Sequence, residues 1–174
     1  LNALLKSCQL PCSNIPTTST IFQIRFGNEE PSAKLTRSTG EEVEILDMQE
    51  LSKNETYDDV AMVYINDTST LVPSNIVLVD SPGISSNFVE HTRAIADFIP
   101  YADALFVLVD ANTGGITQSL KEFLRVAQVV DKPSYLILTK EALLSPESVC
   151  SIKKASIDQN QFNEVISVDA STGK

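Results

Sequence analysis

The feature that most constrains the fold is a regular alternation of apolar runs and helical spacing in the second half of the chain. Three continuous apolar runs have the length and composition of buried strands: 104–110, 134–140 and 164–169. Segments with helical signals precede or separate them, at 87–98, 117–130 and 146–157. Strands that are apolar throughout are typical of a mainly parallel sheet covered on both faces by helices. The sequence therefore predicts an α/β fold.

The first half is expected to add strands joined by polar and acidic segments. Residues 20–26 alternate apolar and polar side chains, which is typical of a half-buried strand. Further strand signals, the last two weaker, lie at 60–65, 76–80, 33–36 and 42–45. A short helix is expected at 47–53. Residues 1–6 have the pattern of the middle of a helix, which should end near residues 5–7. Because no N-cap residue or turn precedes this helix, the chain is expected to be a piece of a longer protein.

The overall composition restricts the classes of partner. The formal charge of −10 and the pI near 4.5 argue against a nucleic-acid groove or a patch for anionic lipids. They leave phosphate binding open, because backbone amides bind phosphate without net positive charge. Three sparse cysteines without CxxC spacing suggest reduced thiols and a reducing compartment such as the cytoplasm. The length of 174 residues fits one domain over 1–174.

Polar residues gather where four predicted strands end. These groups are Asp80-Ser81-Pro82-Gly83, Asp110-Ala111-Asn112, Thr139-Lys140 and Asp169-Ala170-Ser171. In open α/β sheets, ligands bind at the carboxyl ends of the strands. One such acid would be unremarkable, because acids often cap the next helix. Four groups together predict a ligand crevice.

Asp80, Pro82 and Gly83 have the chemistry of a phosphate and metal sensor. Asp80 could hold a water of Mg²⁺, Pro82 would stiffen the turn, and Gly83 would let its backbone N–H approach a phosphate. The simpler interpretation is a Pro-Gly turn with a capping aspartate. Thr17 and Thr18 lie in a loop before a strand, where a hydroxyl could ligate Mg²⁺, or they are ordinary loop threonines.

The last two groups suit a purine base. The aliphatic stem of Lys140, after Thr139, could lie along a purine face. Ala170 could donate its backbone N–H to a purine carbonyl, although 169–171 could also be a plain strand-to-loop junction. The phosphate-loop pattern GxxxxGK[ST] is absent, because Gly173-Lys174 has no upstream glycine at that spacing.

With these residues in place, the chain resembles a GTPase domain of the dynamin superfamily, in its bacterial dynamin-like branch. The resemblance covers nearly all 174 residues and rests on the order of its motifs more than on any one. The segments that carry it are "LNALL", "PTTSTIFQIRFG", "IVLVDSPGI", "YADALFVLVDAN", "KPSYLILTKEALLSPE" and "VISVDASTGK". A translation-factor-like or Era-like GTPase is the next nearest resemblance.

The resemblance implies a three-layer, P-loop-type GTPase fold that lacks its first strand and phosphate loop, and so has a gap in its core. It implies that the parent hydrolyses GTP to GDP with Mg²⁺, self-associates through this domain and remodels membranes through lipid-binding regions elsewhere. The parent would be cytoplasmic or peripheral to the inner face of a membrane, without nucleic-acid partners. Thr17 and Thr18 would be catalytic, and Thr18 and Asp80 would serve the metal. The nucleotide-binding residues would be Asp80, Pro82, Gly83, Thr139, Lys140, Asp169, Ala170 and Ser171.

Two residues differ from the general GTPase pattern, and the first of them keeps other functions open. Ala142 stands where the family has the aspartate that accepts hydrogen bonds from guanine. Ile84 stands where some GTPases carry the glutamine that positions water, a feature that dynamin relatives share. The alternatives are an interaction module that has lost nucleotide binding and an NTPase without guanine selectivity. The segment alone, without its phosphate loop, is expected not to bind nucleotide measurably.

Overall fold

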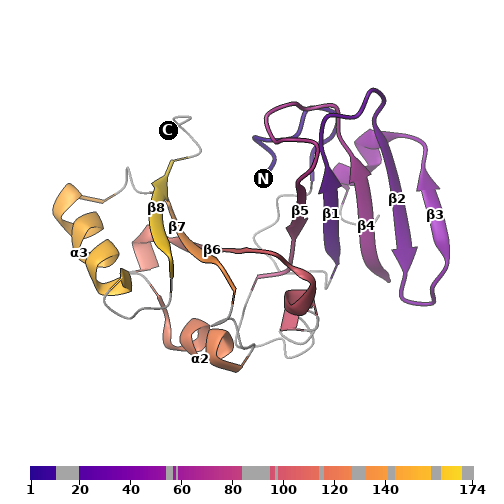
Figure 1. Cartoon of the computed structure of the whole chain (residues 1–174). Coiled ribbons are helices and arrows are strands. Elements are labelled where there is room, and N and C mark those ends of the chain that lie inside the picture. Colours follow the sequence, from indigo (N-terminus) through magenta and orange to yellow (C-terminus); the bar gives the residue numbers. More distant parts are fainter. Residues whose placement is uncertain are drawn as a thin grey trace. The chain divides into compact units, whose positions relative to one another are not determined.

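The computed structural model describes residues 1–10, 20–53, 57, 59–83, 95–96, 98–113, 116–126, 132–140, 144–157 and 162–169. The chain divides into two compact units, Leu1–Gly83 and Ile84–Lys174. Each unit has its own sheet, the first in indigo to magenta and the second ending in yellow (Figure 1).

The first unit is built on a five-stranded sheet with the order β3-β2-β4-β1-β5 (Figure 1). Its strands are β1 Ile21–Arg25, β2 Ser32–Arg37, β3 Glu42–Ile45, β4 Val60–Asn66 and β5 Val77–Asp80. Strand β1 runs parallel to β4, whereas β5 pairs antiparallel with β1. Strand β2 pairs antiparallel with both β3 and β4. A short 3-10 helix, η1 Met48–Ser52, begins after Asp47, whose carboxylate accepts the N–H of Gln49.

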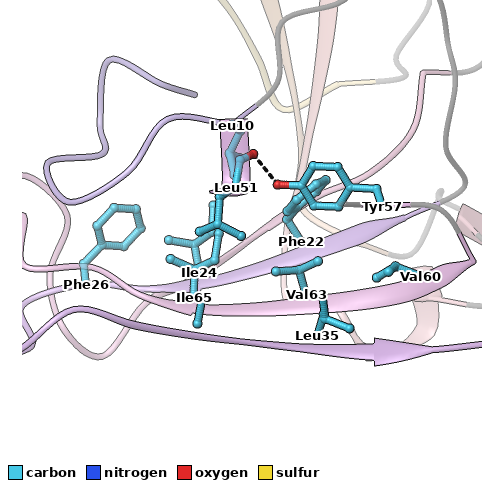
Figure 2. Close-up of a cluster of buried hydrophobic side chains, with 11 residues drawn as sticks. Leu10, Phe22, Ile24, Phe26, Leu35, Leu51, Tyr57, Val60, Val63 and Ile65 are labelled. Carbon is cyan, nitrogen blue, oxygen red and sulfur yellow. Dashed lines mark hydrogen bonds between the residues drawn. The ribbon is translucent and has the colours of Figure 1, made fainter. Parts of the chain in front are cut away.

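Alternating side chains of this sheet form the core of the first unit (Figure 2). Ile24 and Val63 are fully buried, and Leu51 of η1 is buried with them. The ring of Tyr57 packs edge-on against Phe22, with ring centroids 5.2 Å apart. Its hydroxyl donates a hydrogen bond to the carbonyl of Leu51. Leu51 and Tyr57 therefore attach the acidic segment between β3 and β4 to the sheet. Burial of their apolar surface away from water stabilises this packing.

Residues 1–10 are held to the sheet by the carboxylate of Asp67, which directly follows β4 and is fully buried. Asp67 accepts the backbone N–H groups of Lys6 (3.1 and 3.2 Å), Ser7 (2.9 Å) and Ser69 (2.7 Å). The hydroxyl of Ser7 also lies 2.9 Å from that of Thr68. A buried carboxylate is tolerated when its oxygens receive such donors.

The expected helix at the start of the chain is wrong for residues 1–10, which form turns. The N–H groups of Leu4 and Leu5 donate to the carbonyls of Leu1 (2.8 Å) and Asn2 (3.3 Å), two successive turn bonds. Lys6 and Ser7 donate their N–H groups to Asp67, so these groups cannot extend a helix. A helix this short has little stability of its own, and the tertiary contact decides the conformation.

The second unit is built on three parallel strands in the order β6-β7-β8. They are β6 Leu105–Asp110, β7 Ser134–Thr139 and β8 Glu164–Val168. The helices are α2 Gln118–Val126 and α3 Pro146–Ile157, with short 3-10 turns η3 Ile99–Tyr101 and η4 Ala111–Thr113. Leu136 and Leu138 of β7 are fully buried in a cluster with Phe123 of α2, and Ile152 of α3 packs against that cluster.

The sequence-based strands are confirmed with small changes at their ends, and so are α3 and the part of α2 that the structure describes. The short helix expected at 47–53 is a 3-10 helix over Met48–Ser52. Of the expected helix at 87–98, only Ile95, Ala96 and Phe98 are described, and all three are helical. The single-domain organisation stays a prediction. No helix within the described part of the chain is long and apolar enough to cross a bilayer.

Two edge strands expose apolar side chains. Among the described strands, β5 pairs only with β1, and Val77 and Val79 of β5 are 43% and 37% exposed. Strand β6 pairs only with β7 within the described residues, and its Phe106 and Leu108 are 56% and 66% exposed. Long apolar edges are normally paired or covered in a finished sheet.

Candidate functional site

Strand β5 delivers Asp80 to the end of the first unit's sheet. Its backbone lies opposite Phe22 of β1 in the strand register, so its position is set by the sheet. Nearby atoms raise the pKa of the carboxyl by removing it from water, and the amino group of Leu1 and the N–H of Ser81 oppose that rise. The residue as a whole remains exposed. At the end of β5, Asp80 offers a carboxyl group that could bind a cation or a cation's water.

Gly83, three residues further on, lies in open space. A Cβ at this position would meet no atom within 4 Å, and the glycine does not need a positive φ. The described part of the chain therefore gives no internal reason for glycine here. A close approach of the backbone to a ligand would give one. Pro82, between Asp80 and Gly83, is half-buried and restricts the turn.

The strand ends of the second unit meet at one edge. The register pairs Asp110 of β6 with Thr139 of β7, and Thr139 with Val168 of β8. Lys140 directly follows β7 and Asp169 directly follows β8, so the polar groups predicted at these three strands are neighbours. Asp169 is buried, with 8% of its surface exposed. The predicted gathering of Thr139, Lys140 and Asp169 at one sheet edge follows from this register.

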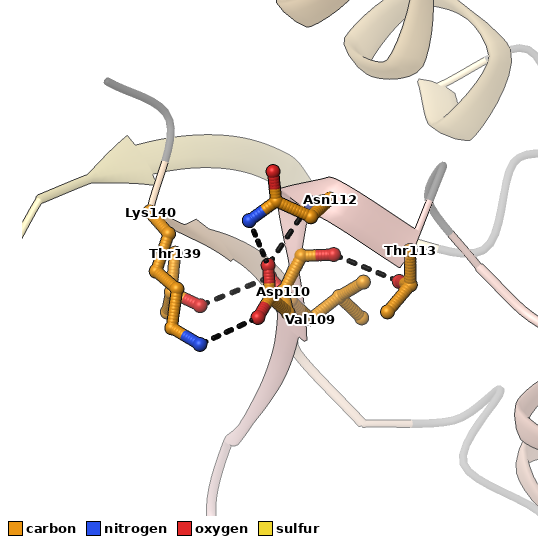
Figure 3. A network of polar contacts seen from close by, with 6 residues as sticks. All are labelled: Val109, Asp110, Asn112, Thr113, Thr139 and Lys140. Atoms are coloured by element: carbon orange, nitrogen blue, oxygen red, sulfur yellow. Dashed lines mark hydrogen bonds and ion pairs between the residues drawn. The ribbon is translucent and has the colours of Figure 1, made fainter. Parts of the chain in front are cut away.

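Asp110 is the centre of the polar network at this edge (Figure 3). One carboxylate oxygen lies 2.7 Å from the Nζ of Lys140, and the other accepts both the N–H and the Nδ2 of Asn112 at 2.9 Å. Thr113 donates its hydroxyl to the Asp110 carbonyl at 2.8 Å, and Thr139 donates to the carbonyl of Val109 at 3.3 Å. The hydrogen bond from Lys140 lowers the pKa of Asp110 most, and the hydrogen bond from the Asn112 N–H lowers it further.

The sequence analysis counted Asp110 among the polar strand ends but gave it no role, and the structure makes it the centre of the polar contacts at this edge. The signal was present, because Asp110 ends an apolar strand as Asp80 does. Its partner Lys140 lies 30 residues away, and the contact depends on two strands being neighbours. Sequence spacing alone does not give that contact.

The remaining predicted residues lie outside the described part of the chain. These are Thr17, Thr18, Ala170 and Ser171, together with Ala142 and Ile84. In the part that the structure describes, no group of three or more His, Cys, Asp or Glu side chains could hold a metal. A lone Asp80 still suits Mg²⁺, which keeps several waters and takes one or two carboxylates together with substrate phosphates.

Comparison with known proteins gives matches across most of the chain. A sequence model of the dynamin family matches residues 1–141. Dynamin-like protein A of Bacillus subtilis (strain 168) is 26% identical over 174 residues, which cover 98% of this chain and 14% of that protein.

Two solved structures of an oligomerised bacterial dynamin pair have the same fold. Their TM-scores are 0.73 and 0.70, at 19% and 18% sequence identity, over 99% of this chain. The matched region is 31% and 37% of those chains. This chain therefore spans less than two fifths of the length of each of these proteins. The work on that pair concerns the long-range sensing and tethering of membranes.

Proposed function

This chain belongs to the dynamin family, and on that premise we propose that it is the greater part of a GTP-binding and GTP-hydrolysing domain. The observation that carries the proposal is the pair of polar strand ends described above. One offers an exposed carboxylate and an unobstructed glycine, Asp80 and Gly83. The other offers a lysine, Lys140, whose side chain is 61% exposed. Binding of a metal ion and a phosphate needs groups such as Asp80 and Gly83. The aliphatic stem of Lys140 could pack against a purine base.

For the phosphate side of the reaction, we propose the residues around the end of β5. Asp80 would bind a water of Mg²⁺. Thr18 (or its neighbour Thr17) would ligate the ion and orient the attacking water. The N–H of Gly83 would contact the γ-phosphate. When bound, Mg²⁺ neutralises charge on the transferring phosphoryl group. The protein contributes position and charge, because phosphoryl transfer needs little covalent participation from side chains.

For the base side, we propose the residues at the ends of β7 and β8. The stem of Lys140 would lie along the purine, next to Thr139, and the segment Asp169-Ala170-Ser171 would contact the base edge. Asp169 is buried where β8 ends, which supports a rigid start for that segment. GTP and GDP are thus the proposed ligands, and GTP turnover with Mg²⁺ is the proposed reaction.

The parent protein is proposed to couple turnover to self-association and to work on membranes. The supporting likeness is the fold of the oligomerised bacterial dynamin pair, whose described role is membrane sensing and tethering. Lipid contact would come from regions outside these 174 residues, since their net charge of −10 does not favour an anionic surface. We place the parent in the cytoplasm, peripheral to the inner face of a membrane, with no nucleic-acid partner.

Ala142 supports a second candidate, an interaction module or an NTPase without guanine selectivity. Without an aspartate at this place, guanine loses two hydrogen bonds to a charged acceptor, and that loss is worth roughly 2–4 kcal/mol. The GTPase proposal therefore requires another group to supply selectivity.

Phosphate release by the full-length protein separates these functions. We expect release from GTP in the presence of Mg²⁺, loss of that release with EDTA, and no inhibition by a tenfold excess of ATP. Equal competition by ATP would favour the unselective NTPase. Absence of both turnover and nucleotide binding would favour the interaction module.

A further inference from the structure

Lys140 has an unusual backbone conformation for a residue with a side chain. Its φ is +60°, in the left-handed region, where a non-glycine residue is strained. It lies at the end of β7, directly beside the proposed base site. Such conformations persist when surrounding contacts hold them. Among the described residues, the side chain of Lys140 makes an ion pair with Asp110, at 2.7 Å.

The ion pair differs from an ordinary surface pair in what it joins. The Glu122–Arg125 pair, at 2.6 Å, links neighbours three residues apart on one turn of α2. The Lys140–Asp110 pair joins the ends of two strands, β7 and β6, from positions 30 residues apart. Figure 3 shows the Asp110 carboxylate between Lys140 and Asn112. One side chain thus holds both the lysine and the turn that follows β6.

Asp110 is also better fixed than an exposed acid would be. Its side chain is 31% exposed, against 61% for that of Lys140. Two donors from Asn112 fix one carboxylate oxygen and leave the other for the ammonium group. Holding the ammonium restricts the aliphatic stem, which otherwise has many rotamers and would lose their entropy on contact with a base.

We propose that Asp110 is a positioning residue of the base site, which holds the Lys140 ammonium so that the lysine stem is preorganised for a purine. The inference rests on the proposed function, because it assumes that Lys140 contacts the base. Asp110 itself would not touch the nucleotide. Its effect would reach the ligand only through Lys140.

The test compares four variants of the full-length protein: Asp110→Asn, Lys140→Met, the double variant, and Glu122→Gln as a matched control from another exposed pair. Asparagine at 110 keeps an oxygen for the Asn112 N–H and removes the charge. We expect the single variants to weaken binding of a fluorescent GTP analogue about tenfold, which is about 1.4 kcal/mol. We expect the double variant to be no weaker than either, because both break the same contact. Glu122→Gln should bind like wild type.

Two further measurements separate positioning from a structural role. Inorganic tripolyphosphate, which has no base, should compete equally well against wild type and Asp110→Asn, and the loss in turnover should fall on KM rather than on kcat. Additive losses, an unchanged affinity in Asp110→Asn, or an equal loss of tripolyphosphate binding with a lower melting temperature would overturn the positioning role alone. A wild type that binds no nucleotide would overturn the proposed function and this inference together.

Discussion

Replacing Asp80 with alanine is expected to lower Mg²⁺-dependent GTP turnover by the full-length protein by about 100-fold. Groups that hold a metal's bound waters typically contribute ten- to a hundredfold, and Asp80 is the charged group that β5 brings to the proposed phosphate site. Its exposure means that few packing contacts are lost with it. The effect should therefore appear in turnover without a matching loss of folded protein.

The measurement is phosphate release over a Mg²⁺ series from micromolar to tens of millimolar. If Asp80 serves the metal, the variant should need more Mg²⁺ for half-maximal rate and recover part of its activity at high Mg²⁺. Asp103→Ala, which removes another exposed acid, should behave like wild type. An Asp80→Ala protein with normal turnover and a normal Mg²⁺ requirement would remove Asp80 from the site.

Replacing Asp67 with alanine is expected to cost about 3 kcal/mol of unfolding free energy. The change leaves the N–H groups of Lys6, Ser7 and Ser69 without their acceptor, and each buried unsatisfied donor costs roughly 1–3 kcal/mol unless water reaches it. Urea unfolding of the 174-residue chain measures the loss. Asp67→Asn should be intermediate, because one acceptor oxygen remains. Asp47→Ala, which removes an exposed cap, should cost about 1 kcal/mol or less.

The reactivity of the Cys8 thiol gives a local measure of the effect of Asp67→Ala. Burial, and then the charge of Asp67, raises the pKa of its thiol to about 11, so the native thiol should react slowly at pH 8. In a background with Cys12 and Cys150 replaced by serine, Asp67→Ala should speed thiol labelling, because the charge is gone and residues 1–10 are released. Unchanged labelling together with unchanged stability would show that Asp67 does not hold this segment.

Strand positions were predictable because each strand is a local pattern. The apolar runs that became β6, β7 and β8 needed no knowledge of their neighbours, since strand and helix periodicity can be read within one segment. The polar strand ends followed, because parallel strands carry them to one edge. Thr139, Lys140 and Asp169 lie at that edge for this reason, and their roles stay a prediction.

Contacts between distant residues were not predictable in the same way. Nothing near Asp67 in the sequence indicates that it accepts N–H groups from Lys6 and Ser7, about 60 residues away, and that contact turned an expected helix into turns. The left-handed backbone of Lys140 and its pair with Asp110 likewise depend on two strands being neighbours. Tertiary contacts of this kind override the weak preference of a short segment.

The central claim is that this domain binds GTP with Mg²⁺, and the most direct test is titration of a fluorescent GTP analogue into the full-length protein. GTP and ATP would compete in parallel titrations, with and without Mg²⁺. The proposed function predicts saturable, Mg²⁺-dependent binding that GTP displaces and ATP does not. Saturable binding displaced equally by ATP would contradict guanine selectivity at Ala142. No binding of either nucleotide would contradict the claim itself and leave a GTPase-like fold that serves as an interaction module.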